Sequence, residues 1–152
     1  SRKVPALLVY DQPSSDFLAR LTYLGHRHGA LTFPAGTIER ARQGAFTNRI
    51  NDELDAVLWA AARHSFILPE EMRVPSVKES LRWEFERSQE HLGEALGGAR
   101  FLMGEIVTIP DLLLAHCARW ATNAKFPLTN DRIIAHRDRM TARTAFKRAV
   151  ER

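Results

Sequence analysis

The sequence predicts a mainly α-helical protein with a short strand and helix ahead of a helical bundle. Apolar side chains recur at the spacing of one helical face along most of residues 37–152. Thr108 and Asp111 have the spacing of a capping box and open a helix that is apolar on nearly every side. By contrast, only residues 3–10 read as a strand. We therefore expect the helix that begins after Thr108 to be the centre of the bundle.

The composition is that of one globular domain. The chain has 152 residues, 45% hydrophobic and 26% charged, with a net charge of +4. The basic residues are interleaved with acids and form no basic block, so no nucleic-acid partner is expected. The single cysteine, Cys117, excludes an internal disulfide, favours a reducing compartment and is expected in the core. No apolar run reaches about 20 residues and no leader is recognised, so we expect a cytoplasmic protein without a membrane partner.

The first segment combines one strand with one helix. Residues 3–10 are apolar and end at a polar turn, but no second strand is predicted to pair with them. This indicates the later part of a sheet domain whose earlier part is absent. A serine or aspartate in residues 14–16 is expected to cap a helix over 17–24 that ends at Gly25. His26 and His28 lack a third ligand, so a polar helix end is expected here and no metal site.

The remaining helices are predicted from caps and apolar stripes. Residues 30–36, with Pro34 and Gly36, read as a linker. The expected helices run from Thr37 to about His64, from the cap Ser76 to Leu96 before Gly97, from Thr108 to about Lys125, from Thr129 or Asn130 to Met140, and from the cap Thr144 to the end.

The predicted central helix begins with several compatible signals. The hydroxyl of Thr108 can accept from the Asp111 amide, and the Asp111 carboxylate can accept from the Thr108 amide. Pro110 suits the first turn, where its missing N–H costs nothing. His116 lies on this helix and is expected to be a hydrogen-bonded core histidine, with a catalytic base as the alternative.

Three motifs resemble a known family. A Phe-Leu-x-Gly turn at 101–104 precedes the Thr108-x-x-Asp111 box, Arg-Thr-Ala-Phe occupies 143–146, and Lys-Val-Pro-Ala-Leu occupies 3–7. Together they resemble the glutathione transferase superfamily, over most of the chain. The resemblance implies a partial thioredoxin-like domain at 1–29, a linker at 30–36 and an all-helical carboxyl-terminal domain at 37–152.

The resemblance also implies a glutathione site. Val4-Pro5 is similar to the Val-Pro of the family, where a cis peptide turns the backbone toward the cysteinyl amide of glutathione; a trans proline at a strand start is the alternative. Ser14 and Ser15 are implied to hold the γ-glutamyl end at a helix amino terminus, against plain helix capping.

The matching long helix of the family lines the cleft for the electrophile and contributes to the dimer. On this chain the implied cleft residues are Asn48, Arg49, Asp52 and Trp59, which could equally form a simple surface.

The implied activity is conjugation of glutathione to a small electrophile, or a glutathione-dependent reduction or isomerisation, with glutathione as cosubstrate and no covalently bound cofactor. A thiol of pKa about 8.5 must be activated for this chemistry. The family's tyrosine, serine or cysteine for this step precedes the Val-Pro strand, and nothing here matches it, so the catalytic residue is expected to be absent from this chain. A homodimer is implied as well. The alternative function is a non-catalytic protein-interaction module, and neither the electrophile nor the transferase class can be predicted.

Overall fold

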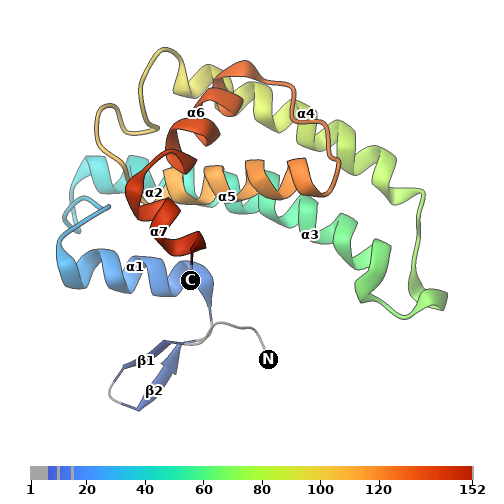
Figure 1. The fold of residues 1–152 in the computed structure, drawn as a ribbon, viewed down its shortest axis with the longest axis horizontal. Helices are drawn as coiled ribbons and strands as arrows, with labels where there is room; N and C mark the ends of the chain where they lie inside the picture. The colour runs from blue at the N-terminus through green and yellow to red at the C-terminus, as the bar shows by residue number, and fades with distance from the viewer. Residues whose placement is uncertain (1–6, 10, 15, 152) are drawn as a thin grey trace.

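The computed structural model describes residues 7–9, 11–14 and 16–151. The described chain is mainly α-helical, which confirms the predicted fold class. Figure 1 shows α5 (Ile109–Asn123) running through the middle, with the other helices arranged around it and a small hairpin at one side. The described elements are β1, β2, α1, α2, η1, α3, η2, η3, α4, α5, α6 and α7.

The amino-terminal strand has a partner, so the prediction of a single strand was wrong. β1 (Leu7–Val9) and β2 (Gln12–Ser14) pair antiparallel, with Leu7 opposite Ser14. Asp11 in the turn adopts φ 63°, a left-handed conformation that aspartate tolerates better than most residues. Pro13 concealed the second strand from sequence reasoning, because proline is accepted in a strand only at an edge such as this one.

The first helix, α1 (Phe17–His28), extends beyond its predicted end. The Asp16 carboxylate caps it by accepting from the Ala19 amide at 2.8 Å, and the left-handed Gly29 ends it. Gly25 was predicted to end the helix but lies inside it. A Cβ there would be 3.1 Å from the Ala30 carbonyl and 3.4 Å from the Ile109 side chain, so glycine is needed for close packing.

One long helical segment follows from Ile38 to Ile67. Thr37 caps it by accepting from the Arg40 amide at 3.2 Å. The segment comprises α2 (Ile38–Ile50), the π turn η1 (Asn51–Asp55), α3 (Ala56–Ala62) and the π turn η2 (Arg63–Ile67). A π turn holds more residues than an α turn, so each one rotates the following side chains around the axis. A short 3₁₀ turn, η3 (Glu70–Met72), leads to the next helix.

The helix α4 (Val77–Leu96) begins without the predicted side-chain cap. Ser76 has helical backbone angles, and its hydroxyl makes no capping bond. Three successive backbone bonds three residues apart, from the amides of residues 77–79, replace the cap. Gly97 ends the helix at φ 56°, as expected.

Two helices complete the bundle around α5. Asn130 caps α6 (Asp131–Thr141) by accepting from the amides of Arg132 and Ile133. The helix α7 covers Thr144–Val150, and Arg143 is its cap residue without a side-chain bond, so Thr144 is the first helical residue and not the cap.

The core lies where α5 meets α2, α3 and α6, and where α4 packs on α3, η1 and α6. Its fully buried side chains come from all five helices and from η1. The largest of the apolar ones are Ile50, Leu54, Leu58, Phe85, Leu92, Ile109, Leu114 and Ile133. The segment before α2 is also attached to this core, since the Leu31 carbonyl accepts from the Ile109 amide at 2.9 Å.

The glycine at position 93 gives a test of how α4 meets α6. A Cβ at Gly93 would lie 2.5 Å from the side-chain amide group of Asn130, the residue that caps α6. We expect Gly93→Ala to destabilise the protein by about 1–2 kcal/mol, because losing the cap outweighs the helix propensity that alanine adds. Urea denaturation followed by circular dichroism measures the change.

Gly44 on α2 is the matched control for Gly93. A Cβ at Gly44 would meet only the end of the Arg40 side chain, at an ordinary 3.6 Å. Gly44→Ala is therefore expected to stabilise the protein by roughly 0.5–1 kcal/mol. Equal effects of the two substitutions would contradict the close contact between Gly93 and Asn130.

Candidate functional site

A row of four aromatic rings runs across one side of the bundle. Phe17 of α1 contacts His116 of α5 with ring centroids 5.8 Å apart, and His116 lies 6.0 Å from Trp120, one turn further along α5. Trp120 in turn meets Trp59 of α3 edge to face at 5.3 Å. Phe17 is 45% exposed and Trp59 is 42% exposed. The row therefore presents aromatic surface to solvent across three helices that are distant in sequence.

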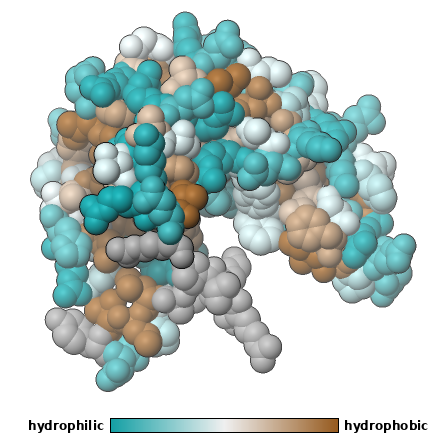
Figure 2. All heavy atoms as spheres, viewed as in Figure 1, coloured by the Kyte–Doolittle hydropathy of each residue, from teal (hydrophilic) through white to brown (hydrophobic). Residues whose placement is uncertain are grey.

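The bundle is open on this side. Figure 2 shows that the surface recedes beneath α5, between α1 and the far end of the long helical segment (residues 38–67) that contains α3. The hairpin β1–β2 lies below α1 in Figure 1. Small-molecule sites are concave and lined by apolar and aromatic side chains with a few polar groups, so this side has the composition of a ligand site.

His116 is exposed, so the prediction of a hydrogen-bonded core histidine at this position was wrong. Its helix is buried on most sides, but His116 and Arg119 lie on the strip of α5 that neighbouring helices leave open. The buried histidine of the protein is His136 on α6, which has no exposed surface.

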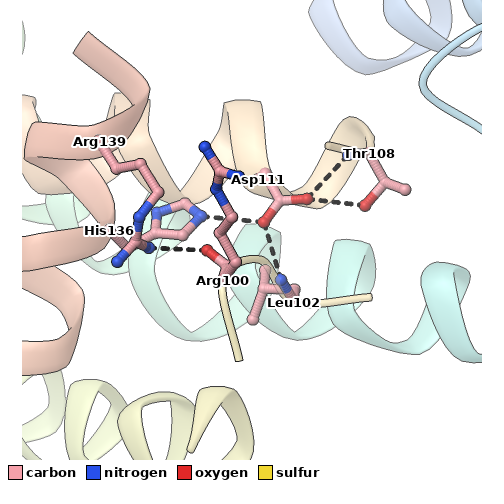
Figure 3. A network of polar contacts seen from close by, with 6 residues as sticks. All are labelled: Arg100, Leu102, Thr108, Asp111, His136 and Arg139. Carbon is pink, nitrogen blue, oxygen red and sulfur yellow. Dashed lines mark hydrogen bonds and ion pairs between the residues drawn. The ribbon is translucent and has the colours of Figure 1, made fainter. Parts of the chain in front are cut away.

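A buried polar network fixes the start of α5, the helix that carries two rings of the row. Asp111 accepts from the amide and the hydroxyl of Thr108, both at 2.8 Å, and from the Leu102 amide at 2.9 Å. His136 Nε2 lies 2.9 Å from Asp111 Oδ1, the same oxygen that accepts from the Leu102 amide. Figure 3 shows how one carboxylate thus joins the loop at Leu102, the first turn of α5 and the helix α6.

The network also determines the ionisation of Asp111. Burial works to raise the pKa of this carboxyl, but the hydrogen bonds from His136, Leu102 and Thr108 outweigh burial and hold the pKa below its usual value. The capping box is formed, and the Asp111 amide additionally bonds the Thr108 carbonyl at 3.0 Å. Beside it, the Arg139 guanidinium donates to the Arg100 carbonyl at 2.7 Å and attaches α6 to the same loop.

Solved structures share the fold of this chain. The chain is similar to BphK, a bacterial glutathione S-transferase solved as a ternary complex, with a TM-score of 0.84 and 20% identity over 97% of this chain and 72% of that chain. It is similar to a glutathione transferase from Methylococcus capsulatus, with a TM-score of 0.83 and 26% identity over the same shares. A sphingomonad glutathione S-transferase complexed with glutathione matches with a TM-score of 0.82 and 18% identity over 98% of this chain and 73% of its own. No protein-family model and no curated protein matches the sequence.

The chain has the fold of the glutathione S-transferase superfamily.

The predicted glutathione residues of this transferase fold lie at its amino-terminal end. Ser14 is the last residue of β2, half-buried, and is not the cap of α1, because Asp16 takes that position. Val4, Pro5 and Ser15 lie outside the described residues. Their proposed roles stay predictions.

The four predicted cleft residues separate on the transferase fold. Asn48 and Arg49 are exposed on α2, where Arg49 pairs with Glu53 at 3.6 Å. Asp52 lines a hollow of about 400 Å³ against α4, whereas Trp59 contacts Trp120 of α5 and is part of the aromatic row. Asp52 is part of the π turn η1, and Trp59 follows this turn in α3, so the wide turn rotates Trp59 relative to Asp52 in a way that a regular helical spacing could not indicate.

An unusual cation lies one turn inside α1. Arg20 is only 9% exposed, and its Nη1 atom has no hydrogen-bond partner among the residues that the structure describes. A buried guanidinium without a partner costs free energy, so it stands out from the other arginines. Nothing in the sequence alone indicated it, because burial of a charged residue depends on what packs over it.

Two other candidate chemistries find little to support them among the described residues. Cys117 is fully buried, and burial raises the pKa of its thiol far above its usual value, with the charge of Asp55 adding to this effect. No three histidine, cysteine or acidic side chains come together to hold a metal in the part of the chain that the structure describes. Its described helices are also too short or too polar to cross a bilayer.

Proposed function

We propose that this chain is the substrate-binding part of a glutathione transferase that conjugates glutathione to small electrophiles, with the thiol-activating residue outside this chain. The observation that carries the proposal is the exposed aromatic row on the open side of a transferase fold, with the amino-terminal hairpin and α1 beside it. In this proposal the electrophile packs on the row and glutathione lies toward the hairpin and the start of α1.

The electrostatics at the start of α1 support the place of glutathione. A helix amino terminus attracts carboxylates through its free amides and its dipole. Asp16 already satisfies the Ala19 amide, so the anion would be held largely by the cation Arg20, whose Nη1 is unpartnered. We therefore include Arg20 with Ser14, Ser15, Val4 and Pro5 in the proposed glutathione site.

The test of the proposed function separates binding from thiol activation. Glutathione is titrated into the chain by calorimetry, and conjugation to 1-chloro-2,4-dinitrobenzene is then compared with the uncatalysed rate at pH 6.5 and at pH 9. Above the thiol pKa of about 8.5 glutathione ionises without help. We expect saturable binding, acceleration at pH 9 through positioning of the two substrates, and little acceleration at pH 6.5.

Each other outcome has a definite meaning. Strong acceleration at pH 6.5 would show that a thiol activator is present in this chain. If glutathione gives no heat of binding and the chain accelerates conjugation at neither pH, the transferase proposal is rejected and the non-catalytic interaction module is favoured.

Substitution of Arg20 gives a sharper prediction for the glutathione site. We expect Arg20→Leu to weaken glutathione binding by about 10-fold or more, the usual effect of losing a charged hydrogen bond. The same variant should be at least as stable to urea as the wild type, because it removes a buried and unpartnered charge. Arg20→Lys should keep part of the affinity.

Arg27 on the same helix is the control for Arg20. It is exposed and donates to the Tyr23 hydroxyl at 2.6 Å. Arg27→Leu should leave glutathione binding unchanged. If Arg20→Leu and Arg27→Leu bind glutathione equally well, Arg20 has no part in the site.

We further propose that the protein is located in the cytoplasm and forms a homodimer. The long helical segment of residues 38–67 would contribute to the dimer contact. The charged residues Arg49, Asp52 and Glu53 and the exposed Trp83, which borders the hollow beside Asp52, support a polar contact with an aromatic anchor there. Sedimentation equilibrium of the wild type and of Trp83→Ala tests it, and a monomeric wild type would reject it.

A further inference from the structure

His116 is the one imidazole in the aromatic row, and the one ring of the row whose nitrogens can both donate and accept. It lies between the phenyl ring of Phe17 at 5.8 Å and the indole of Trp120 at 6.0 Å. Trp120 extends the row to Trp59 on α3. A ligand lying flat along the row would therefore meet ring surface at either side of His116 and the imidazole between them.

The hydrogen-bonding capacity of His116 is unused. Neither of its ring nitrogens makes a hydrogen bond to any residue that the structure describes, although the side chain is exposed at the site. The histidines His136 and His64 differ in this respect. His136 bonds Asp111 at 2.9 Å, and His64 Nδ1 accepts from the Val74 amide at 3.1 Å. Each of these two imidazoles has one nitrogen bonded within the fold, whereas both nitrogens of His116, which lies exposed in the aromatic row, are available to a ligand.

We propose that His116 determines the specificity of the electrophile site, by donating a hydrogen bond to a carbonyl or nitro oxygen on a flat aromatic substrate that packs against Trp120. This inference rests on the proposed function, because that proposal places the electrophile on the aromatic row. It adds the feature that distinguishes one aromatic compound from another: an acceptor oxygen at the edge of the ring system.

A ligand on the row would make one non-directional contact and one directional contact. Aromatic rings attract a flat aromatic ligand by burial and by offset or edge-to-face contact, and this attraction differs little between ligands of equal shape. A hydrogen bond in a partly shielded site adds a preference of about 5–10-fold in affinity for the ligand that can accept it. The aromatic rings would thus supply affinity for any flat aromatic ligand, and His116 would supply the preference for ligands that carry an acceptor oxygen.

Two probes of equal shape test the inference by equilibrium dialysis without glutathione. One probe is 2-acetylnaphthalene, which carries a carbonyl oxygen, and the other is 2-ethylnaphthalene, which does not. The wild type should bind the acetyl compound about 5–10-fold more tightly. His116→Phe should remove this preference while it retains affinity for the ethyl compound, and His116→Gln should keep part of the preference, because its amide can still donate.

Substitutions of exposed aromatic side chains test whether the two probes bind on the aromatic row. Trp59→Ala should weaken both probes to a similar extent, since it removes ring surface and leaves His116 in place. Phe66 of η2 is also exposed, at 69%, but is not a member of the row, so Phe66→Ala should change neither affinity.

The outcomes distinguish this inference from the proposed function. An unchanged preference in His116→Phe would overturn the role of His116, as would a wild type that binds both probes equally or binds neither. A wild type that prefers the acetyl compound through His116 but gives no heat with glutathione would support the inference about His116 and reject the transferase proposal.

Discussion

Asp111→Ala is expected to lower the free energy of unfolding by about 3–5 kcal/mol, the range seen when one partner of a buried charged network is removed. The carboxylate is fully buried and accepts from the Leu102 and Thr108 amides, the Thr108 hydroxyl and His136. Alanine would leave these donors buried without an acceptor, at about 1–3 kcal/mol for each one that water cannot reach. Urea denaturation followed by circular dichroism measures the loss.

Thr108→Val and Asp111→Asn are the controls for this prediction. Thr108→Val removes one hydroxyl and leaves the other three donors bonded to Asp111, so it should cost only about 1 kcal/mol. Asp111→Asn keeps one acceptor oxygen but places an amide group against donors, so its cost should lie between the other two. A loss below about 1 kcal/mol in Asp111→Ala would show that the network does not hold the start of α5.

The pH dependence of stability gives a second measurement on the same residue. The pKa of Asp111 in the folded protein lies below the value of 3.8 that the carboxyl has when unperturbed, and the unfolded chain is expected to have about that value. The stabilisation from ionised Asp111 is therefore complete above about pH 4 and is lost as the pH falls through the folded pKa. The unfolding free energy of the wild type should fall more steeply than that of Asp111→Asn below about pH 4, and parallel curves would contradict the lowered pKa.

Local signals explain why much of this fold could be predicted from the sequence. The capping box of Thr108 and Asp111, the caps Thr37 and Asn130 and the end at Gly97 depend on residues within four positions of one another. The buried stripe of α4 likewise follows from a repeat every three or four residues. These features are present in a helix before it meets any partner, so the sequence contains them.

The site could be predicted only in part, because it is made of contacts between distant elements. Trp59 was predicted to line the electrophile cleft, and that role stays a prediction; its neighbours in the aromatic row, Trp120, His116 and Phe17, come from α5 and α1. The π turn η1 has no sequence signature that would have indicated the rotation between Asp52 and Trp59. The exposure of His116 depends on which strip of α5 its neighbours leave uncovered, and no repeat along the helix indicates that strip.

Gln89→Leu is expected to cost about 3–4 kcal/mol, although the two side chains are similar in volume and the position is fully buried. The Gln89 side chain is the link between α4 and the turn before α6. Its Nε2 donates to the Pro127 carbonyl at 2.7 Å, and its Oε1 accepts from the amides of Thr129 and Asn130 at 2.9 and 3.1 Å. Leucine would fill the space and leave one carbonyl and two amides without partners.

Hydrogen exchange separates this specific loss from a general one. The Thr129 and Asn130 amides should exchange much faster in Gln89→Leu than in Ser88→Ala, a control on the same helix that leaves the Gln89 bonds intact. If both variants lose the same protection, the turn before α6 is held by its apolar packing. A selective loss at these two amides would mean that one glutamine side chain places α6, and with it His136, against the carboxylate that begins the central helix.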